Sequence, residues 1–317
     1  MVNPVVVDLI KKFKKQLCDS ESCPSDSSLR QYAYSIAWLM KRVDFPEDGS
    51  MPKPEHVMEH LENARVTNRK RCAVYTALKK WHGCHGEKCD CDKYSKPLVR
   101  AKHAVDTEYA KQERTPKQQA NWVEYPVLKK FAKKLLEEVL TWNKHEFWEK
   151  DQFVKAQLAF ILAFHLKFPI RRDLATVQWG KKEYAPNENY LDKRAKKIVI
   201  QKHKTTRWKG TVSFPLSRVQ WRLWRLLRIQ QQKRNLNGGY IVVSKHYRPL
   251  TPNGYSSWIA REMKRCPGCE KKAVGCLLIR HCCISYVRRN EKTIKEKKEF
   301  ADRCMHSVAR NEKYRID

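Results

Sequence analysis

Acidic residues are scarce in this chain. Asp and Glu number 34 among 317 residues, whereas Lys and Arg number 66, so that the formal net charge is +32. A field of this strength attracts polyanions, and nucleic acid is the usual one. The basic residues are spread through segments with apolar periodicity, which favours a folded body with a basic surface over a ribosome- or membrane-surface protein. Much of the affinity for nucleic acid should come from phosphate contacts and fall steeply with salt.

A long uninterrupted apolar run and a secretory pattern at the start are also missing. The longest apolar segment, 153–168, is broken by Lys155, Gln157, His165 and Lys167. It is too short and too polar to cross a bilayer, and it predicts a buried helix and no membrane partner. Twelve cysteines without a secretory signal predict reduced thiols or zinc ligands in place of disulfides.

The chain has no tandem repeats, and its length favours two domains. Residues 1–95 are predicted to form an all-α domain, because apolar residues recur there at a spacing of three to four. Periodicity fades after Gly83, and 96–121 is predicted as an interdomain linker. The helix expected over 68–81 has a basic face, and charges that merely solvate it are the alternative to DNA binding. Its candidate DNA-binding residues are Arg69, Lys70, Arg71, Lys79 and Lys80.

The second domain, 122–317, is predicted to be mainly α with a small β-sheet, an α+β fold. Strands are expected at 196–200, 210–215 and 240–243, the first two flanking a hairpin region. Apolar periodicity predicts helices at 128–139, 153–168, 217–231, 251–264, 276–289 and 295–306.

Two arginine motifs in this domain are suited to a phosphate. Arg171 and Arg172 follow Pro169 at the end of the apolar helix, and Arg280-His281 lies inside another apolar helix. The planar guanidinium grips two phosphate oxygens and does not deprotonate. Burying an arginine is costly unless it has an anionic partner, so Arg280 is the stronger signal. A surface arginine pair is the plain alternative for Arg171 and Arg172.

Three further residues complete what phosphoryl transfer through a tyrosine ester requires. Lys204, in the hairpin region, can donate a proton to a leaving oxygen, although Lys202 and Lys209 compete for that role. His306 precedes Tyr314 by eight residues, and an imidazole can hydrogen-bond a phosphate while a tyrosine attacks it. Taken singly, Tyr314 is more often a docking aromatic than a nucleophile.

In this order the motifs resemble those of the tyrosine recombinase, or phage-integrase-like, superfamily, which is related in mechanism to type IB topoisomerases. Residues 169–174 match the first box, Lys204 the hairpin lysine, 278–281 the second box, and 305–307 with Tyr314 the third. The resemblance covers about 126–317, and 1–95 look like the family's helical core-binding domain, a DNA clamp. The boxes look closer to recombinases of eukaryotic large DNA viruses or mobile elements than to bacterial ones.

The resemblance implies a mechanism without ATP or a catalytic metal. Tyr314 would attack a DNA phosphodiester, leaving a 3′-phosphotyrosyl bond and a free 5′-hydroxyl. Arg171 and Arg280 would clamp the phosphate, with Arg172 as the alternative to Arg171. Lys204 would protonate the leaving oxygen, and His306 would hydrogen-bond the phosphate. His281 belongs to the second box, with its role left open.

The implied function is site-specific DNA recombination or integration. Its partners would be double-stranded DNA and further copies of the chain, forming a tetramer when two sites are paired. The place of action would be the nucleus or cytoplasm, and the host nucleus for a virus or mobile element. A type IB topoisomerase-like activity, or an inactive DNA-binding protein on the same fold, are the alternatives.

Three departures from the family pattern bear on these expectations. Leu277 stands where relatives often have a His or Lys three residues before the second-box arginine. The spacing after Arg171 is one residue short of the common pattern. Relatives often pass a C-terminal segment to a neighbouring subunit; with three residues after Tyr314 we expect no such exchange, unless the sequence is truncated or the tyrosine helix itself is exchanged.

The cysteines give a weaker signal. Cys266 and Cys269 have the two-residue spacing of a zinc knuckle, and Cys276 is nearby. A structural zinc ion at these three residues is a candidate, and reduced thiols in loops are the alternative. A second cluster of His and Cys lies within 82–91.

Overall fold

The fold is described from a computed structural model. It describes residues 4–17, 24–46, 50–84, 88–180, 183–236, 239–290, 293–312 and 314–315. The chain divides into two compact units, residues 1–111 and 112–317, each of which is described by itself. The predicted fold class, mainly α with a small antiparallel sheet, is confirmed. Among the described residues, no helix is both long and apolar enough to cross a bilayer.

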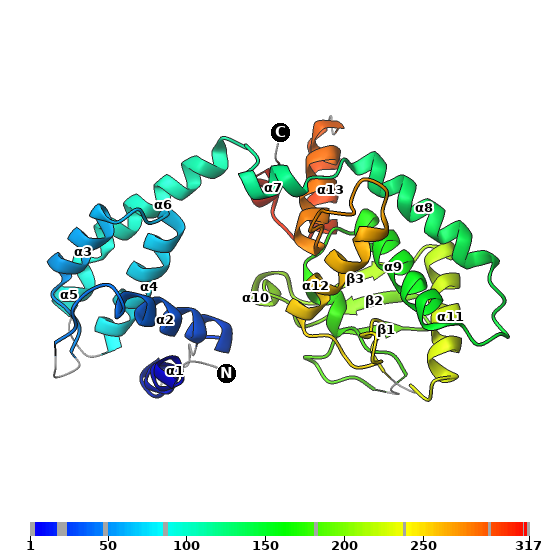
Figure 1. Ribbon diagram of the computed structural model, residues 1–317, viewed down its shortest axis with the longest axis horizontal. Helices are drawn as coiled ribbons and strands as arrows, with labels where there is room; N and C mark the ends of the chain where they lie inside the picture. Colours follow the sequence, from blue (N-terminus) through cyan, green and yellow to red (C-terminus); the bar gives the residue numbers. More distant parts are fainter. Residues whose placement is uncertain are drawn as a thin grey trace. The chain divides into compact units, whose positions relative to one another are not determined.

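The first unit is a bundle of helices around one apolar core (Figure 1). Phe13 is fully buried at its centre, where its ring meets Trp81 edge-on at 5.3 Å and Tyr32 at 5.7 Å. The helices are α1 (Pro4–Leu17), α2 (Asp26–Leu39), α3 (Pro54–Asn63), α4 (Asn68–Cys84), α5 (Lys88–Lys93) and α6 (Ser95–Ala110).

Helix α6 occupies most of the stretch that the sequence suggested as an extended linker. It packs along α4 and belongs to the first unit, which ends at Lys111. Its apolar periodicity is weak because only Leu98 and Ala101 are buried along it. Past the division, Thr115 and Gln118 form a reciprocal capping box that starts the short helix α7 (Pro116–Asn121).

The second unit holds the sheet and the remaining helices (Figure 1). Its strands are β1 (Tyr190–Asp192), β2 (Lys197–Ile200) and β3 (Val212–Pro215). Its helices are α8 (Tyr125–Thr141), α9 (Lys150–Lys167), η1 (Arg172–Thr176), α10 (Thr206–Lys209), α11 (Arg218–Gln232), α12 (Pro252–Glu262), η2 (Met263–Arg265), α13 (Cys276–Asn290), α14 (Ile294–Arg303) and α15 (Val308–Glu312).

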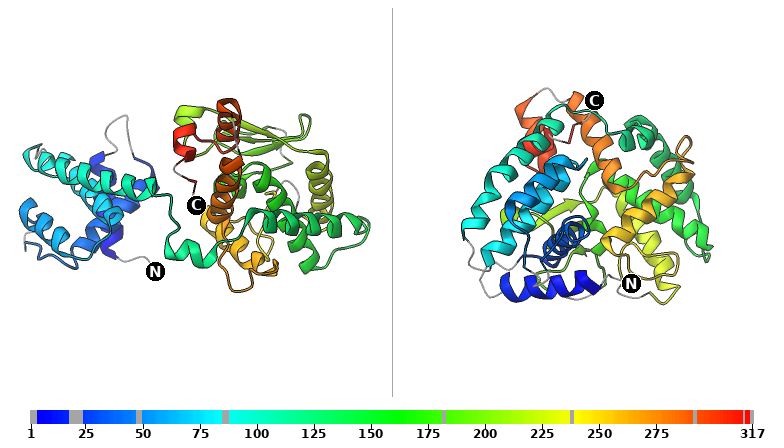
Figure 2. Two further views of the ribbon diagram at one scale, coloured as in Figure 1. Left: turned by 90° about the horizontal axis from the view of Figure 1, so that it is seen from above. Right: turned by 60° about the vertical axis from the view of Figure 1, so that its left-hand side comes forward.

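Helix α9 is the centre of this unit. It is buried nearly all round and packs against α8, α11, α12 and α13, as its apolar sequence predicted. Figure 2 shows the same packing of helices and strands from two further directions. The one amide deep in its apolar face, on Gln157, is fully buried, and its Oε1 accepts the backbone N–H of Val243 at 2.8 Å. This bond fixes α9 against the chain that follows α11.

The sheet has the antiparallel order β1-β2-β3. Ile198 pairs with Leu191 on one side and with Phe214 on the other. The two strands predicted around the hairpin region are therefore present, and β1 is an addition to them. The strand predicted at 240–243 is not formed, because only isolated bridges, at Tyr240 and Val243, involve these residues.

The end of α14 differs from the prediction of a helix over 295–306. The helix stops at Arg303, and Met305 has a positive φ of 56°, a conformation that a helix cannot continue through. His306 consequently lies in a turn between α14 and α15. Its separation from Tyr314 is bridged by a turn and a short helix and not by two turns of one helix.

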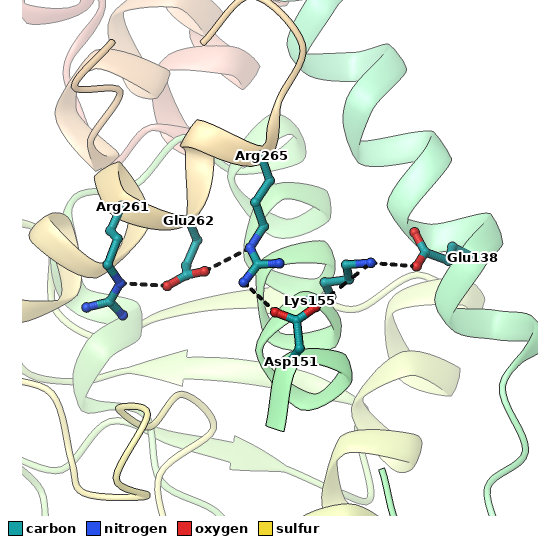
Figure 3. Close-up of polar contacts among 6 residues, drawn as sticks. All are labelled: Glu138, Asp151, Lys155, Arg261, Glu262 and Arg265. Carbon is teal, nitrogen blue, oxygen red and sulfur yellow. Dashed lines mark hydrogen bonds and ion pairs between the residues drawn. The ribbon is translucent and has the colours of Figure 1, made fainter. Parts of the chain in front are cut away.

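An ion-pair network joins α12 and η2 to α9 and α8 (Figure 3). Glu262 is 6% exposed and accepts from Arg261 Nε at 2.8 Å and from Arg265 Nε at 3.0 Å. Arg265 also pairs with Asp151 at 2.6 Å. The network continues through Lys155, which lies 4.0 Å from Asp151 and 3.0 Å from Glu138.

Neutralising Glu262 should weaken this unit more than neutralising an exposed member of the same network. We expect Glu262→Gln to lower the free energy of unfolding by about 1–3 kcal/mol, because two arginines lose a largely buried counter-charge. The more exposed Glu138→Gln should cost less than about 1 kcal/mol. Urea unfolding of the two variants tests this, and equal losses would contradict a special role for Glu262.

Candidate active site

Arg280 is a buried cation at the centre of the second unit. It lies on α13 and is 1% exposed. Its Nη1 donates to the Pro169 carbonyl oxygen at 2.5 Å, and its Nη2 donates to that of Cys304 at 2.8 Å. Burial lowers the pKa of its guanidinium, which remains far above neutrality. The arginine thus joins the chain just before η1 to the chain just after α14.

His306 lies between two arginines. Arg171 Nη2 is 3.1 Å from its Nε2, and Arg280 Nη2 reaches both ring nitrogens, with Nδ1 at 3.0 Å. A guanidinium has only donors, and an imidazole has an acceptor nitrogen only when neutral. Burial, and after it the nearby charges of Arg280, Arg171, Arg310 and Lys209, together lower the pKa of His306 to about 2. The ring is therefore neutral and accepts a hydrogen bond.

Tyr314 lies directly over this cluster. Its ring centroid is 4.7 Å from that of His306 and 5.1 Å from the guanidinium carbon of Arg280. The side chain is half-buried and packs against Ile284 and Phe300. The structure therefore brings together four of the residues singled out in the sequence, from the position just before η1, from α13, from the turn after α14 and from the end of the described chain.

His281 holds the tyrosine from its other side. The two rings are stacked with centroids 4.9 Å apart and an interplanar angle of 23°, and His281 Nδ1 is 3.1 Å from the Tyr314 carbonyl oxygen. Stacking of this kind orients a ring, whereas accepting the phenolic proton requires a nitrogen in line with the hydroxyl. Leu277, one helical turn earlier, is 56% exposed and has no proton-accepting group.

Among the three lysines of the hairpin region, Lys209 is the one bonded to the His306 turn. Its Nζ donates to the His306 carbonyl oxygen at 2.8 Å and to Asp302 at 3.0 Å. Lys202 and Lys204 are exposed and line a cavity of about 510 Å³ together with Arg171. Lys204 is thus close to the first arginine box but is not bonded to the turn that holds His306.

Arg172 points to a different partner from that of Arg171. It is exposed, lines the same cavity, and donates from Nη1 to Asn253 Oδ1 at the start of α12. Arg171 is half-buried and is the one that meets His306. Arg171 is therefore the member of the pair that contacts His306, and its catalytic role stays a prediction.

The three cysteines suggested as zinc ligands do not gather. Cys276 is buried against His165, with Sγ 3.8 Å from Nε2, and its thiol donates to the Arg171 carbonyl oxygen at 3.5 Å. Burial raises the pKa of the thiols of Cys266 and Cys276 to about 12, which keeps both protonated. Within the described ranges no three His, Cys, Asp or Glu side chains form a metal site. His85 and the side chains of Cys84 and Cys89, in the second cluster, lie outside the described residues.

Two residues behind the site were not singled out by sequence. His165 Nε2 lies 2.8 Å from the hydroxyl of Tyr255 and 3.8 Å from Cys276 Sγ, and both side chains are buried. Burial lowers the pKa of His165 to about 3, so it too is neutral. The sequence offered one signal for His165, a histidine inside a largely apolar helix. It offered no signal for Tyr255.

The basic residues of α4 divide into structural and exposed ones. Arg71 donates from Nε to the Leu61 carbonyl oxygen at 2.9 Å, and Lys79 donates to Ser95 Oγ at 2.7 Å. Lys70 lies 4.5 Å from the Trp38 ring, and Arg69 lies 4.7 Å from that of Tyr109. Arg69 and Lys80 are the exposed members of the set Arg69, Lys70, Arg71, Lys79 and Lys80.

Comparison with known proteins gives structural likeness only. No protein-family model matches the chain, and neither does any curated protein. Among solved structures, XerA recombinase is 12% identical with a TM-score of 0.38, over 98% of this chain and 93% of that one.

Two integrases are similar to the same extent. A lambda integrase dimer bound to a COC′ core site is 11% identical with a TM-score of 0.44, and the Tn1549 transposon integrase in complex with transposon right end DNA is 10% identical with a TM-score of 0.45. In both cases 98% of this chain and 95% of the other are covered. All three are recombinases or integrases, the class that the motifs resemble.

The neutrality of His306 predicts a pH dependence of stability. Its folded-state pKa of about 2 lies below the ordinary value of 6.5. The unfolded chain therefore takes up a proton that the folded chain does not as the pH falls through about 6.5, and stability is lost at up to about 1.4 kcal/mol per pH unit. Urea unfolding at about pH 7 and about pH 5 should show a smaller loss for His306→Gln than for the parent chain. Equal losses would mean that His306 titrates normally.

Proposed function

We propose that this chain breaks and rejoins DNA strands as a site-specific recombinase or integrase. The observation that carries the proposal is the convergence of Arg171, Arg280 and Tyr314 on His306. Two guanidiniums, an imidazole and a phenol within hydrogen-bonding and ring-contact distance form a set suited to a phosphodiester. The net charge of +32 supports DNA as the molecule that provides this phosphodiester.

In the proposed reaction the Tyr314 oxygen forms a bond to phosphorus as the bond from phosphorus to the 5′-oxygen breaks. The products are a 3′-phosphotyrosyl ester and a free 5′-hydroxyl. Tyr314 gives up its phenolic proton to solvent as it attacks, and Lys204 supplies a proton to the leaving oxygen and is reprotonated from solvent, so that the proton count balances. A 5′-hydroxyl from a second strand then attacks the ester, releases Tyr314 and restores a phosphodiester. Because one ester replaces another, the exchange needs no external energy.

The hydrogen bonds of the two arginines indicate how a phosphate would enter. Arg171 and Arg280 both donate to His306. A phosphodiester oxygen is a stronger acceptor than neutral imidazole, so it would replace His306 as their partner. Its negative charge would also raise the pKa of His306 and make the ring a donor to the phosphate. Arg280, at 1% exposure, becomes available to DNA only through this exchange of partners.

His281 and Lys209 are assigned supporting roles. His281 orients the Tyr314 ring by stacking, and Lys209 holds the turn that carries His306. The proposal includes homo-oligomers on double-stranded DNA, tetrameric when two sites are paired, acting in the nucleus or cytoplasm. An origin in a virus or mobile element, with genome integration as the outcome, belongs to the same proposal.

The first test offers a nicked suicide duplex to the parent chain and to Tyr314→Phe. The nick lets the 5′-hydroxyl fragment diffuse away, so that the covalent intermediate accumulates. We expect a denaturation-resistant protein–DNA adduct with the parent chain alone. If both bind DNA and neither forms the adduct, the chain is a DNA-binding protein that has lost catalysis, as the burial of Arg280 would favour. An adduct with Tyr314→Phe would point to another nucleophile.

The second test separates the two lysine roles. We expect Lys204→Ala to slow cleavage by roughly 100- to 10,000-fold, the usual contribution of a general acid. A duplex with sulphur in place of the bridging 5′-oxygen has a leaving group that needs no protonation, so it should restore the rate of Lys204→Ala. It should not restore Lys209→Ala, because that variant loses the support of the His306 turn. Rescue of Lys209→Ala and not Lys204→Ala would exchange the two assignments.

A further inference from the structure

Trp208 is the feature of the second unit that the proposed chemistry leaves unexplained. Its side chain is 82% exposed, whereas Trp179 and Trp224 in the same unit are buried to 2%. Single exposed apolar residues are ordinary on protein surfaces. An indole, however, has a large apolar surface, which is costly to expose to water. The loop that carries Trp208 also sets it apart from other exposed apolar residues.

The loop that displays Trp208 is held by its own hydrogen bonds. The backbone N–H of His203 donates to Thr206 Oγ1 at 2.8 Å, and the His203 ring Nε2 lies 2.8 Å from the Gly210 carbonyl oxygen. The backbone N–H of Trp208 donates to the Thr205 carbonyl oxygen at 3.0 Å. These hydrogen bonds hold the four-residue helix α10 in place between β2 and β3; residues 203–210 are called the platform below.

A glycine ends this platform. Gly210 has φ +59° and ψ −152°, a conformation open to glycine and strained for other residues, and a Cβ there would meet nothing within 4 Å. Glycine is thus favoured at position 210 by the backbone conformation and not by a lack of room for a side chain. The shape turns the chain from α10 straight into β3 and leaves the helix standing out from the sheet.

The platform is docked on the candidate active site. Lys209, the residue after Trp208, donates to the His306 carbonyl oxygen at 2.8 Å and to Asp302 at 3.0 Å. Lys204, at the start of the same loop, lines the cavity of Arg171. Trp208 is therefore one residue, about 3.8 Å between Cα atoms, from a lysine whose side chain is bonded to the turn that holds His306.

We propose that Trp208 is a DNA-contacting residue whose indole stacks on bases beside the phosphodiester that is cut. This inference rests on the proposed function. Every base has a face on which an aromatic ring can stack, and apolar side chains at base steps help to open them. The lysines near Trp208 in the chain, Lys204 and Lys209, favour a polyanion over an apolar protein surface as the partner of this loop. The indole would add a contact without charge to a site otherwise built from cations.

The absence of charge on the indole provides the sharpest test. Loss of a phosphate-binding lysine lowers the slope of log affinity against log salt by about one, whereas loss of a stacking contact weakens binding equally at every salt concentration. We expect Trp208→Ala to weaken binding to a duplex of about 30 base pairs by roughly 5- to 150-fold with an unchanged slope. Trp208→Phe should recover part of the loss, because a smaller ring still stacks.

The measurement uses the full chain with Tyr314→Phe, so that no covalent adduct distorts the equilibrium. Fluorescence anisotropy of the labelled duplex gives affinity over a range of salt. Phe147→Ala, which removes a 59% exposed aromatic from the loop between α8 and α9, is the matched control and should bind as tightly as the parent. Acrylamide quenching of the Trp208 emission, obtained by subtracting Trp208→Phe, should fall when the duplex is added.

Each outcome decides the proposal. Weaker binding at an unchanged salt slope, with protection of Trp208 by the duplex, supports it. Equal affinity of Trp208→Ala and its parent, with Trp208 still quenched in the complex, overturns it and leaves the proposed function intact. Protection that depends on protein concentration and not on DNA assigns the indole to contact between copies of the chain, which also overturns it. Failure of the parent chain to bind any duplex removes the proposed function as well.

Discussion

The second unit depends on the burial of one guanidinium. Arg280 is 1% exposed on α13, and its two Nη atoms donate to two backbone carbonyl oxygens and to His306, whereas its Nε is buried without a hydrogen-bond partner among the described residues. A buried cation without such partners would be prohibitively costly, so the chain before η1 and the turn after α14 must both be in place around it. The same contacts that satisfy Arg280 bring Arg171 and Tyr314 to His306. The stability of the unit and the assembly of the candidate site therefore depend on the same contacts of Arg280.

The electrostatics of the site follow from this arrangement. Arg171, Arg280, Arg310 and Lys209 all act to keep His306 unprotonated, which leaves the site with an excess of positive charge and a neutral acceptor at its centre. The arginines of such a site would form stronger hydrogen bonds to an anionic phosphodiester than to the neutral imidazole. The buried and neutral His165 and Tyr255 lie behind it and add no charge of their own. The ion-pair network of Glu262 stabilises α12, the helix that supplies Tyr255, from its far end.

The fold class and most helices of the second unit could be predicted, because long amphipathic or apolar segments such as α9 and α11 leave a clear period. Segments with few buried residues could not: the pattern of α6 predicts a linker, because Leu98 and Ala101 are the residues that it buries. The strand expected at 240–243 failed because apolar residues there bury against α9 without a partner strand. A positive φ at Met305, invisible in a periodic pattern, ended α14 early.

The sequence by itself determined the basic charge, the order of the arginine, lysine, histidine and tyrosine motifs, and the helical character of the segment that carries Arg280, because these are properties of composition and local periodicity. Only the tertiary structure decided which members of each motif meet. It joined Arg171 and not Arg172 to His306, attached Lys209 to the same turn, separated Cys276 from Cys266 and Cys269, and stacked His281 on Tyr314. Those choices depend on how distant segments pack around a buried cation, and packing between distant segments leaves no trace in local spacing.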